Sequence, residues 1–251
     1  MISLPDPTYY QYVSHMYHEN KLIPFDTYTP DTNFNYSEYD RLRFNQILID
    51  NVDYIKDKKI LDLGCHAGFM SFVAQYIGAK SCIGVNARKW PVEVGNYFFN
   101  QLNINNVKLI NENIENFEFL KTVCNQSNTV ILASVLGHCR NLEKILSIVS
   151  DSQIENVIIE STVIDDDNMI PKLHYYTQDA SYDFNGYDGD RKIVLGANPN
   201  RKFLETILYF YNWKITKYVV EGEVNLQWFG TPGLNNYPFL RRYVVISATR
   251  F

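Results

Sequence analysis

The sequence predicts an α/β fold built on a mostly parallel β-sheet, and three observations lead to this prediction. From Lys58 onward, short apolar runs of strand length alternate with helical segments, which is typical of βαβ units whose sheet is covered on both faces. A glycine turn at 64–68 joins the first of these runs to a helix. Near the end of the chain, two strand-like runs follow one another without a helix between them, which predicts an antiparallel pair at one edge of the sheet.

Residues 1–57 are expected to be helical, because they are rich in Tyr, Asp and Asn and contain no strand-like runs. We place two helices there, at Thr8–His18 and Ser37–Val52, and Ser37 can cap the second. Parallel strands are expected at Lys59–Leu63, Ser81–Val85, Val107–Ile110, Thr129–Ala133 and Val157–Glu160. The helices between them are expected at Phe69–Ile77, Pro91–Leu102, Ile114–Cys124 and Leu142–Ser150.

The last third of the chain departs from this alternation. Residues 162–198 are expected to form a long functional loop or insertion, because the strand–helix rhythm stops there. A helix with Pro199 near its start follows, and strands at 213–220 and 241–251, joined by a loop at 221–240, complete the sheet. We therefore expect an N-terminal helical lid or substrate segment, 1–57, and one ligand-binding domain, 58–251, that carries the insertion 162–198.

The composition narrows the class of protein. The chain has 251 residues, a net charge of −5 and 46% hydrophobic residues, which indicates a globular protein without the basic surface that non-specific nucleic-acid binding needs. The N-terminus has no signal-peptide pattern and no apolar run reaches membrane-spanning length, so a soluble, cytoplasmic protein with no membrane association is expected. The cysteines, Cys65, Cys82, Cys124 and Cys139, lack metal-ligand spacing, so no metal is expected. Cys65, Cys82 and Cys139 lie in or beside apolar runs, where we expect reduced, buried thiols.

The glycine turn excludes two common kinds of ligand. Counted from Gly64, the second and third glycines of a dinucleotide fingerprint fall on His66 and Phe69, so NAD is disfavoured. The second glycine and the lysine of a P-loop fall on Phe69 and Met70, so ATP is disfavoured as well. Gly64 and Gly68 still permit a tight turn, and Asp62 just before it can counter an ammonium group. S-adenosylmethionine (SAM) suits such a turn, since it has an amino-acid end, a sulfonium and a nucleoside but no phosphate.

The stretch ILDLGCHAGF resembles the first motif of class I SAM-dependent methyltransferases, usually E/D-x-G-x-G-x-G, with a histidine at the middle glycine. The resemblance implies a Rossmann-like, mostly parallel seven-stranded sheet with an antiparallel closing pair, and SAM as cofactor. It implies a cofactor-binding role for Asp62, Gly64, Cys65, His66 and Gly68. His66 would either narrow the pocket and cover the methionine end, or be an exposed turn residue.

Later segments are similar to further motifs of the same family, in the same order. CIGVNARK would place Asn86 and Ala87 at the ribose, and INENIENF would place Asn113 and Ile114 at the adenine. Asparagine replaces the usual acid twice, so we expect weaker ribose anchoring, because charge-assisted hydrogen bonds are roughly twice as strong as neutral ones. TVILASVLGHCRN would place Ser134 and Leu136 near the sulfonium and His138 at the end of the strand.

A further resemblance gives an alternative. ENVIIESTVIDDDN followed by PNRKFLETILYFYNWKI is similar to the tRNA wobble-uridine carboxymethyltransferases, which use carboxy-SAM. The extra carboxylate would need a cation, and Arg88, Lys89, Arg201 or the Arg241–Arg242 pair can supply it. The N-terminal part is short and acidic where a tRNA-binding enzyme would need Lys and Arg, so tRNA as a partner is in doubt.

The expected activity is therefore SAM-dependent transfer of a methyl group to a small-molecule or nucleobase acceptor. Carboxymethyl transfer to tRNA and a catalytically inactive binding module are the alternatives. His138 is a candidate general base, although packing at the strand end is the favoured interpretation. Glu160 is a candidate on the acceptor side, or it pairs with Arg or Lys from the insertion. Aromatic residues of the insertion, from Tyr175 to Tyr187, can stack a planar acceptor or form their own small core.

Overall fold

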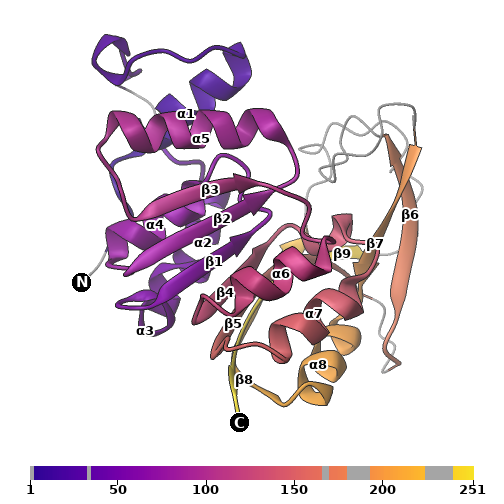
Figure 1. Ribbon diagram of the computed structural model, residues 1–251. Helices are drawn as coiled ribbons and strands as arrows, with labels where there is room; N and C mark the ends of the chain where they lie inside the picture. Colours follow the sequence, from indigo (N-terminus) through magenta and orange to yellow (C-terminus); the bar gives the residue numbers. More distant parts are fainter. Residues whose placement is uncertain (1–2, 33–34, 166–169, 180–192, 224–239) are drawn as a thin grey trace.

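The computed structural model describes residues 3–32, 35–165, 170–179, 193–223 and 240–251 (Figure 1). Its centre is a seven-stranded sheet in the order β3-β2-β1-β4-β5-β9-β8. The strands are β1 (Lys59–Leu63), β2 (Ser81–Asn86), β3 (Val107–Asn111), β4 (Thr129–Ala133), β5 (Asn156–Asp165), β8 (Trp213–Glu223) and β9 (Leu240–Arg250). The first five are parallel, and β9 pairs antiparallel with both β5 and β8. The predicted fold class is confirmed.

Helices cover both faces of this sheet, because its strands carry apolar side chains on both sides. On β1, for example, Ile60 belongs to one core cluster and Leu61 to the other, as the twofold alternation of strand side chains requires. The first cluster packs against α1 (Pro7–Glu19), α2 (Glu38–Ile47), α4 (Phe69–Ile77) and α5 (Lys89–Gln101). The second packs against α6 (Phe117–Cys124), α7 (Leu142–Ser150) and α8 (Arg201–Phe210).

The N-terminal segment is fixed to the domain by aromatic packing. Helix α1 lies beside α5 (Figure 1), and the fully buried Tyr12 meets Phe25 edge-on at a ring-centroid distance of 4.9 Å. Tyr9 meets Phe72 of α4 at 5.4 Å. Two helices are present where two were expected, but the second one breaks. It continues beyond Ile47 as a 3₁₀ turn, Ile49–Asn51, and a short helix, α3 (Val52–Ile55).

The segment expected to be a loop from residue 162 contains regular structure. Strand β5 runs on to Asp165 because it pairs with β9 along its whole length, so Glu160 lies inside a strand and not at its end. Beyond it, β6 (Leu173–Asp179) and β7 (Ile193–Pro199) form a separate two-stranded antiparallel sheet. Helix α8 begins at Arg201, two residues after Pro199, which belongs to β7.

Several expected boundaries shift by a few residues for local reasons. Helix α6 begins at Phe117 and not at Ile114, because the side chain of Asn116 caps it by accepting a hydrogen bond from the Phe119 amide. Cys65, Cys82 and Cys139 are free and buried, as expected, and Cys124 is free and buried as well. None of the helices in the described part of the chain has the length and apolar character that crossing a membrane requires.

Candidate functional site

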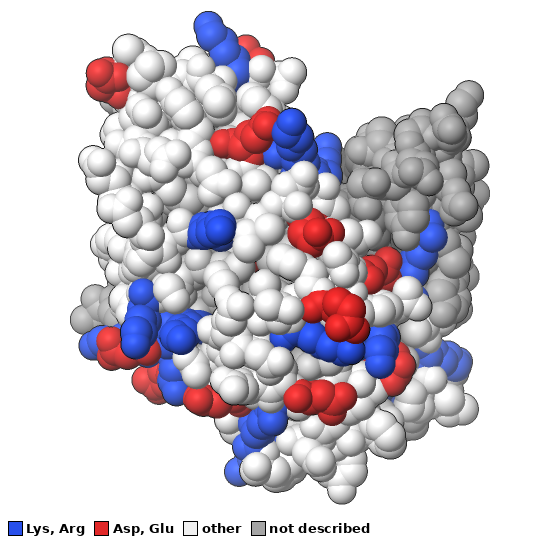
Figure 2. Space-filling view, viewed as in Figure 1, with Lys and Arg blue, Asp and Glu red and all other residues white. Residues whose placement is uncertain are grey.

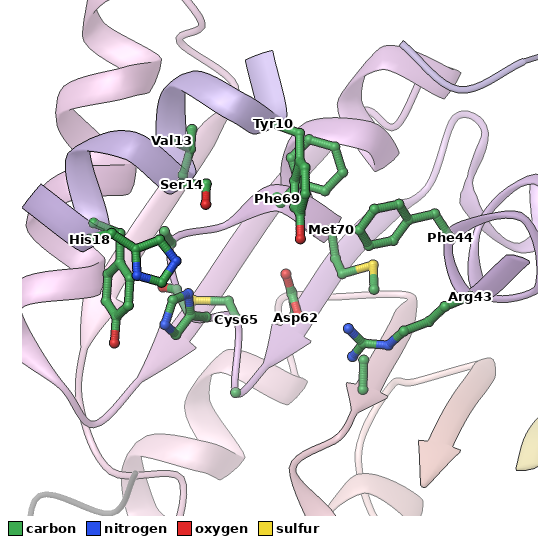
Figure 3. A pocket seen from close by; sticks show the side chains of 15 residues that line it. Tyr10, Val13, Ser14, His18, Arg43, Phe44, Asp62, Cys65, Phe69 and Met70 are labelled. Carbon is green, nitrogen blue, oxygen red and sulfur yellow. The ribbon is translucent and has the colours of Figure 1, made fainter. Parts of the chain in front are cut away.

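A cavity of about 310 Å³ lies at the carboxyl end of β1, between the sheet and the N-terminal helices (Figure 3). Strand order reverses between β1 and its neighbour β4, and open α/β sheets bind ligands at this kind of switch point. The glycine turn, α1, α2 and α4 form its walls. The lining residues are Tyr10, Val13, Ser14, Tyr17, His18, Arg43, Phe44, Asp62, Gly64, Cys65, His66, Ala67, Phe69, Met70 and Ala133.

The backbone dihedral angles and the close packing of the glycine turn restrict the residue type at its two glycine positions. Gly64, His66 and Gly68 have φ angles of 79°, 51° and 78°, a left-handed region that glycine enters without steric cost. A Cβ atom on Gly64 would lie 2.6 Å from Cγ2 of Val135, and one on Gly68 would lie 2.8 Å from Cδ1 of Leu109. Both glycines are therefore required by packing behind the turn as well as by its dihedral angles.

Asp62 presents a buried carboxylate to the cavity. Its side chain accepts a hydrogen bond of 2.7 Å from the Ser71 hydroxyl. Burial raises the pKa of Asp62 to about 6, while the Ser71 hydrogen bonds and the charge of Arg43 act in the opposite direction. Above pH 6 the cavity therefore contains a negative charge where the sequence predicts a partner for an ammonium group.

His66 lines the cavity, with its half-buried ring edge-on to Tyr17 at a centroid distance of 4.4 Å. It is not the exposed turn residue of the second interpretation. Burial lowers its pKa to about 4, and the charges of Arg88 and His18 add to this effect. The ring is therefore neutral at physiological pH and does not repel a cationic ligand.

Cys65 lies beside His66 and is buried under the same turn. Burial raises the pKa of its thiol well above the usual value, and the charge of Asp62 adds to the rise. The thiol is therefore uncharged, and Cys65 contributes an apolar surface to the cavity wall.

The residues predicted to bind the nucleoside lie further along the same sheet edge and do not line this cavity. The Asn86 side chain accepts a hydrogen bond of 2.8 Å from the Arg88 amide, and that of Asn113 accepts one of 2.9 Å from the Glu115 amide. Both amide oxygens thus stabilise their own loops. Asn111, which the sequence analysis missed, donates to the carbonyls of Asn86 and Ala87 at 3.0 and 2.8 Å. Ile114 is buried in the core.

On the other side of the cavity, the end of β4 and the middle of β5 hold a charged cluster. Glu160 is 1% exposed and accepts hydrogen bonds from the Ser134 hydroxyl at 3.0 and 2.8 Å. Nη2 of Arg43 lies 3.0 Å from Oε2 of Glu160 and 3.1 Å from Oγ of Ser134. Within the described residues, the cation that pairs with Glu160 therefore comes from α2. Arg191 and Lys192 of the insertion, which were possible partners in the alternative interpretation, lie outside the described residues. The only signal in the sequence was that a buried acid needs a cation.

Leu136 and His138 lie on a 3₁₀ turn, Leu136–His138, after β4. Leu136 is fully buried in the core and does not line the described cavity. His138 is half-buried and does not line the described cavity. Burial lowers its pKa to about 4, which makes it a weak base and favours the packing interpretation.

Among the cations chosen from the sequence for a second carboxylate, Arg88, Lys89 and Arg201 do not line the described cavity. Lys89 pairs with Glu93 at 3.5 Å, and Arg201 donates to the Tyr218 hydroxyl at 2.9 Å. Arg88 contributes its charge near His66. The side chains of Arg241 and Arg242 lie outside the described residues. Arg43, which the sequence analysis did not select, is the cation that lines the cavity.

Comparisons with known proteins agree on the architecture. Neither a protein-family model nor a curated sequence matches the chain. Among solved structures, the N-terminal domain of EvdMO1, crystallised in the presence of S-adenosylhomocysteine (SAH) and D-fucose, is 14% identical, with a TM-score of 0.64 over 95% of this chain and 96% of that one. Magnesium protoporphyrin IX methyltransferase (ChlM) from Synechocystis PCC 6803, with bound SAH, is also 14% identical, with a TM-score of 0.53 over 88% and 90%. The chain has the Rossmann-like fold of the class I SAM-dependent methyltransferases.

Proposed function

We propose that the protein is a SAM-dependent methyltransferase that acts on a small-molecule or nucleobase acceptor. The observation that carries the proposal is the buried carboxylate of Asp62, which faces a cavity of about 310 Å³ directly beside the first-motif turn. Gly64 lines the cavity without a side chain, so a ligand can approach the backbone of the turn at this point.

The residues of the cavity suit the amino-acid end of SAM. Asp62 would pair with the ammonium group, and the neutral ring of His66 would lie near the cation without repelling it. Apolar side chains of Phe44, Phe69 and Met70 complete the wall, and their exclusion of water strengthens the charge interactions inside. Bound SAM would supply the electrophilic methyl group.

The rest of the cofactor would extend along the sheet edge toward β2 and β3. We propose that Asn86 and Ala87 lie at the ribose, and Asn113 and the backbone of Ile114 at the adenine. Because the side-chain oxygens of Asn86 and Asn113 already accept backbone hydrogen bonds, their NH₂ groups are the donors left for this role. The acceptor would enter on the side of Ser134 and Glu160, and methyl transfer would depend on proximity and in-line orientation.

Carboxy-SAM is the second candidate cofactor. It is supported by the position of Arg43 in the cavity wall, because the extra carboxylate of carboxy-SAM would need a cation. A tRNA acceptor has less support. On the face shown in Figure 2, Lys and Arg side chains lie among Asp and Glu side chains, so the described part of that face forms no broad basic surface. Nucleic-acid binding depends on such a surface.

Calorimetric titration with SAM, SAH, carboxy-SAM and NAD tests the proposal. We expect binding of SAM and SAH, no binding of NAD, and at least about tenfold weaker SAM binding by Asp62→Asn, since hydrogen bonds to charged groups contribute about 1.5–3 kcal/mol. Asp50→Asn is the matched control, because Asp50 is exposed and pairs with Lys217 outside the cavity. Binding of neither SAM nor SAH would refute the proposal, and tighter binding of carboxy-SAM would favour the second candidate.

Turnover of SAM separates an enzyme from a binding module. We expect SAH to accumulate when the protein is incubated with SAM and a pool of planar small molecules or nucleosides. Tight SAM binding without turnover on any acceptor would favour the binding module.

A further inference from the structure

We propose that Arg43 binds the carboxylate of the ligand's amino-acid end, and that this carboxylate competes with Glu160 for the guanidinium. The inference rests on the proposed function, because it assigns a further contact to the same ligand. It concerns a residue of the N-terminal segment, outside the stretches that resemble the cofactor-binding motifs.

The position of Arg43 is the first argument. It lines the cavity together with Asp62, and its guanidinium points into the space in front of that carboxylate (Figure 3). Its charge acts on Asp62, where it lowers the pKa. Among the residues that line the described cavity, Arg43 is the one Lys or Arg.

Complementary charge is the second argument. The amino-acid end of SAM carries an ammonium and a carboxylate on one carbon atom, so a site that binds it needs an anion and a cation close together. Asp62 and Arg43 supply these two charges side by side in one cavity (Figure 3). The planar guanidinium of arginine matches a carboxylate in geometry and can bind it through two parallel hydrogen bonds.

Glu160 is the group that would compete with the ligand carboxylate for the Arg43 guanidinium. Arg43 already holds this buried carboxylate at 3.0 Å, and one guanidinium presents several donors that two carboxylates can share. A ligand carboxylate at Arg43 would lie near Glu160, and like charges at short range repel. Loss of the Glu160 charge removes an attraction for the cationic groups that both ligands share, and it removes the repulsion only for the ligand that has the carboxylate, so the preference for that ligand should widen.

The test compares SAM with decarboxylated SAM, two ligands that differ only in that carboxylate, by calorimetric titration. The wild type is expected to bind SAM about tenfold or more tightly than decarboxylated SAM. Arg43→Gln is expected to abolish this preference and Glu160→Gln to widen it. Arg41→Gln is the matched control, because Arg41 lies exposed on the same helix and does not line the cavity, and it should keep the wild-type preference.

Two further measurements keep the test decisive. If Arg43→Gln fails to fold because Glu160 loses its partner, the double variant Arg43→Gln/Glu160→Gln removes both charges and should bind the two ligands equally. Titration with carboxy-SAM shows which carboxylate Arg43 contacts. If loss of Arg43 weakens the binding of carboxy-SAM only, Arg43 contacts the carboxylate of the transferred group and the inference is wrong.

The outcomes separate the inference from the proposed function. A wild type that binds SAM and decarboxylated SAM equally, or an Arg43→Gln protein that still prefers SAM, overturns the inference and leaves the methyltransferase intact. A wild type that binds none of the adenosyl ligands overturns both.

Discussion

Arg43 of α2 and Glu160 of β5 form an ion pair of 3.0 Å between residues that are 117 positions apart in the chain. The pair joins the N-terminal segment to the middle of the sheet, and Ser134 completes it by contacting both side chains. Glu160 is almost fully buried, whereas Arg43 is 20% exposed through its side chain. The burial of Glu160 determines what happens when the pair is broken.

Removal of Arg43 should destabilise the protein strongly. Arg43→Ala leaves a buried carboxylate without its cation, and we expect a loss of about 3 kcal/mol in the free energy of unfolding. Urea denaturation measures this loss. Lys58→Ala is the matched control, because its partner Glu155 is exposed and not buried, and it should cost less than about 1 kcal/mol. Equal losses in the two variants would contradict the buried-pair interpretation.

Replacement of Asp62 by Asn should stabilise the protein while it weakens ligand binding. The folded pKa of Asp62, about 6, lies above the ordinary value of 3.8, so the folded state binds more protons between these limits. Its stability therefore falls as pH rises from about 4 to about 6. Asp62→Asn removes this loss and should be more stable at pH 7.5, by at most about 3 kcal/mol.

Urea denaturation at pH 5 and at pH 7.5 tests the pH dependence. The stability difference between Asp62→Asn and wild type should grow with pH, while Asp50→Asn should show no such growth because Asp50 is exposed. A constant difference at the two pH values would show that the carboxyl titrates at its ordinary pKa.

Gly64→Ala should be more damaging than Gly78→Ala, although both residues have a positive φ, 79° and 111°. The left-handed backbone costs roughly 1–2 kcal/mol for a residue with a side chain in either case. Only at Gly64 does the new Cβ collide with a buried side chain, that of Val135, whereas at Gly78 the nearest atom is 3.6 Å away. We expect an additional cost of about 1–3 kcal/mol from this overpacking.

The double variant Gly64→Ala/Val135→Ala is the check on that explanation, since it removes the collision and should recover part of the additional cost. Thermal denaturation compares the three proteins. If the two glycine variants are equally stable, the turn adjusts without strain.

Tyr12→Phe should loosen the N-terminal segment. The Tyr12 hydroxyl donates a hydrogen bond of 2.5 Å to the Ile23 carbonyl, and the ring is fully buried against Phe25. Loss of this bond is expected to cost about 1 kcal/mol, since a partly buried carbonyl loses its donor. Tyr209→Phe, on an exposed tyrosine, should leave the stability unchanged. Hydrogen exchange of the α1 amides would show whether the loss is local to that helix.

Most of the sheet could be predicted from the sequence, since buried parallel strands appear as short apolar runs between helical segments. The strands at Lys59–Leu63 and Thr129–Ala133 have the predicted bounds. The length of β5 could not be predicted, because its second half depends on pairing with β9 at the far end of the chain. The β6–β7 sheet was not predicted for a similar reason, because each of its strands pairs with the other across an intervening segment of the chain.

The same distinction applies to the candidate site: residues placed by a local motif could be predicted, and residues placed by contacts between distant segments could not. Asp62, Gly64 and His66 could be found because a local turn motif places them together. Arg43 could not, since nothing near it in the sequence shows that α2 packs over β5. For Asn86, the sequence could not show which of its side-chain atoms is available to a ligand. Its residue type and position fit a ribose contact, but its side-chain oxygen accepts a hydrogen bond from the Arg88 amide.

The aromatic contacts between α1 and α5 have a consequence for the order of events during synthesis. Tyr12 and Met16 of α1 are wholly buried in the finished protein, and α5 ends only at Gln101. A ribosome must therefore translate the whole stretch from the end of α1 at Glu19 to Gln101 before α1 can pack against the complete α5. Until then these apolar side chains face water, and a nascent chain in that state is open to aggregation or to chaperone capture. Helix α1, which forms one wall of the cavity, is therefore synthesised before β1, α4 and α5, and it can pack in its final position only after these elements have formed.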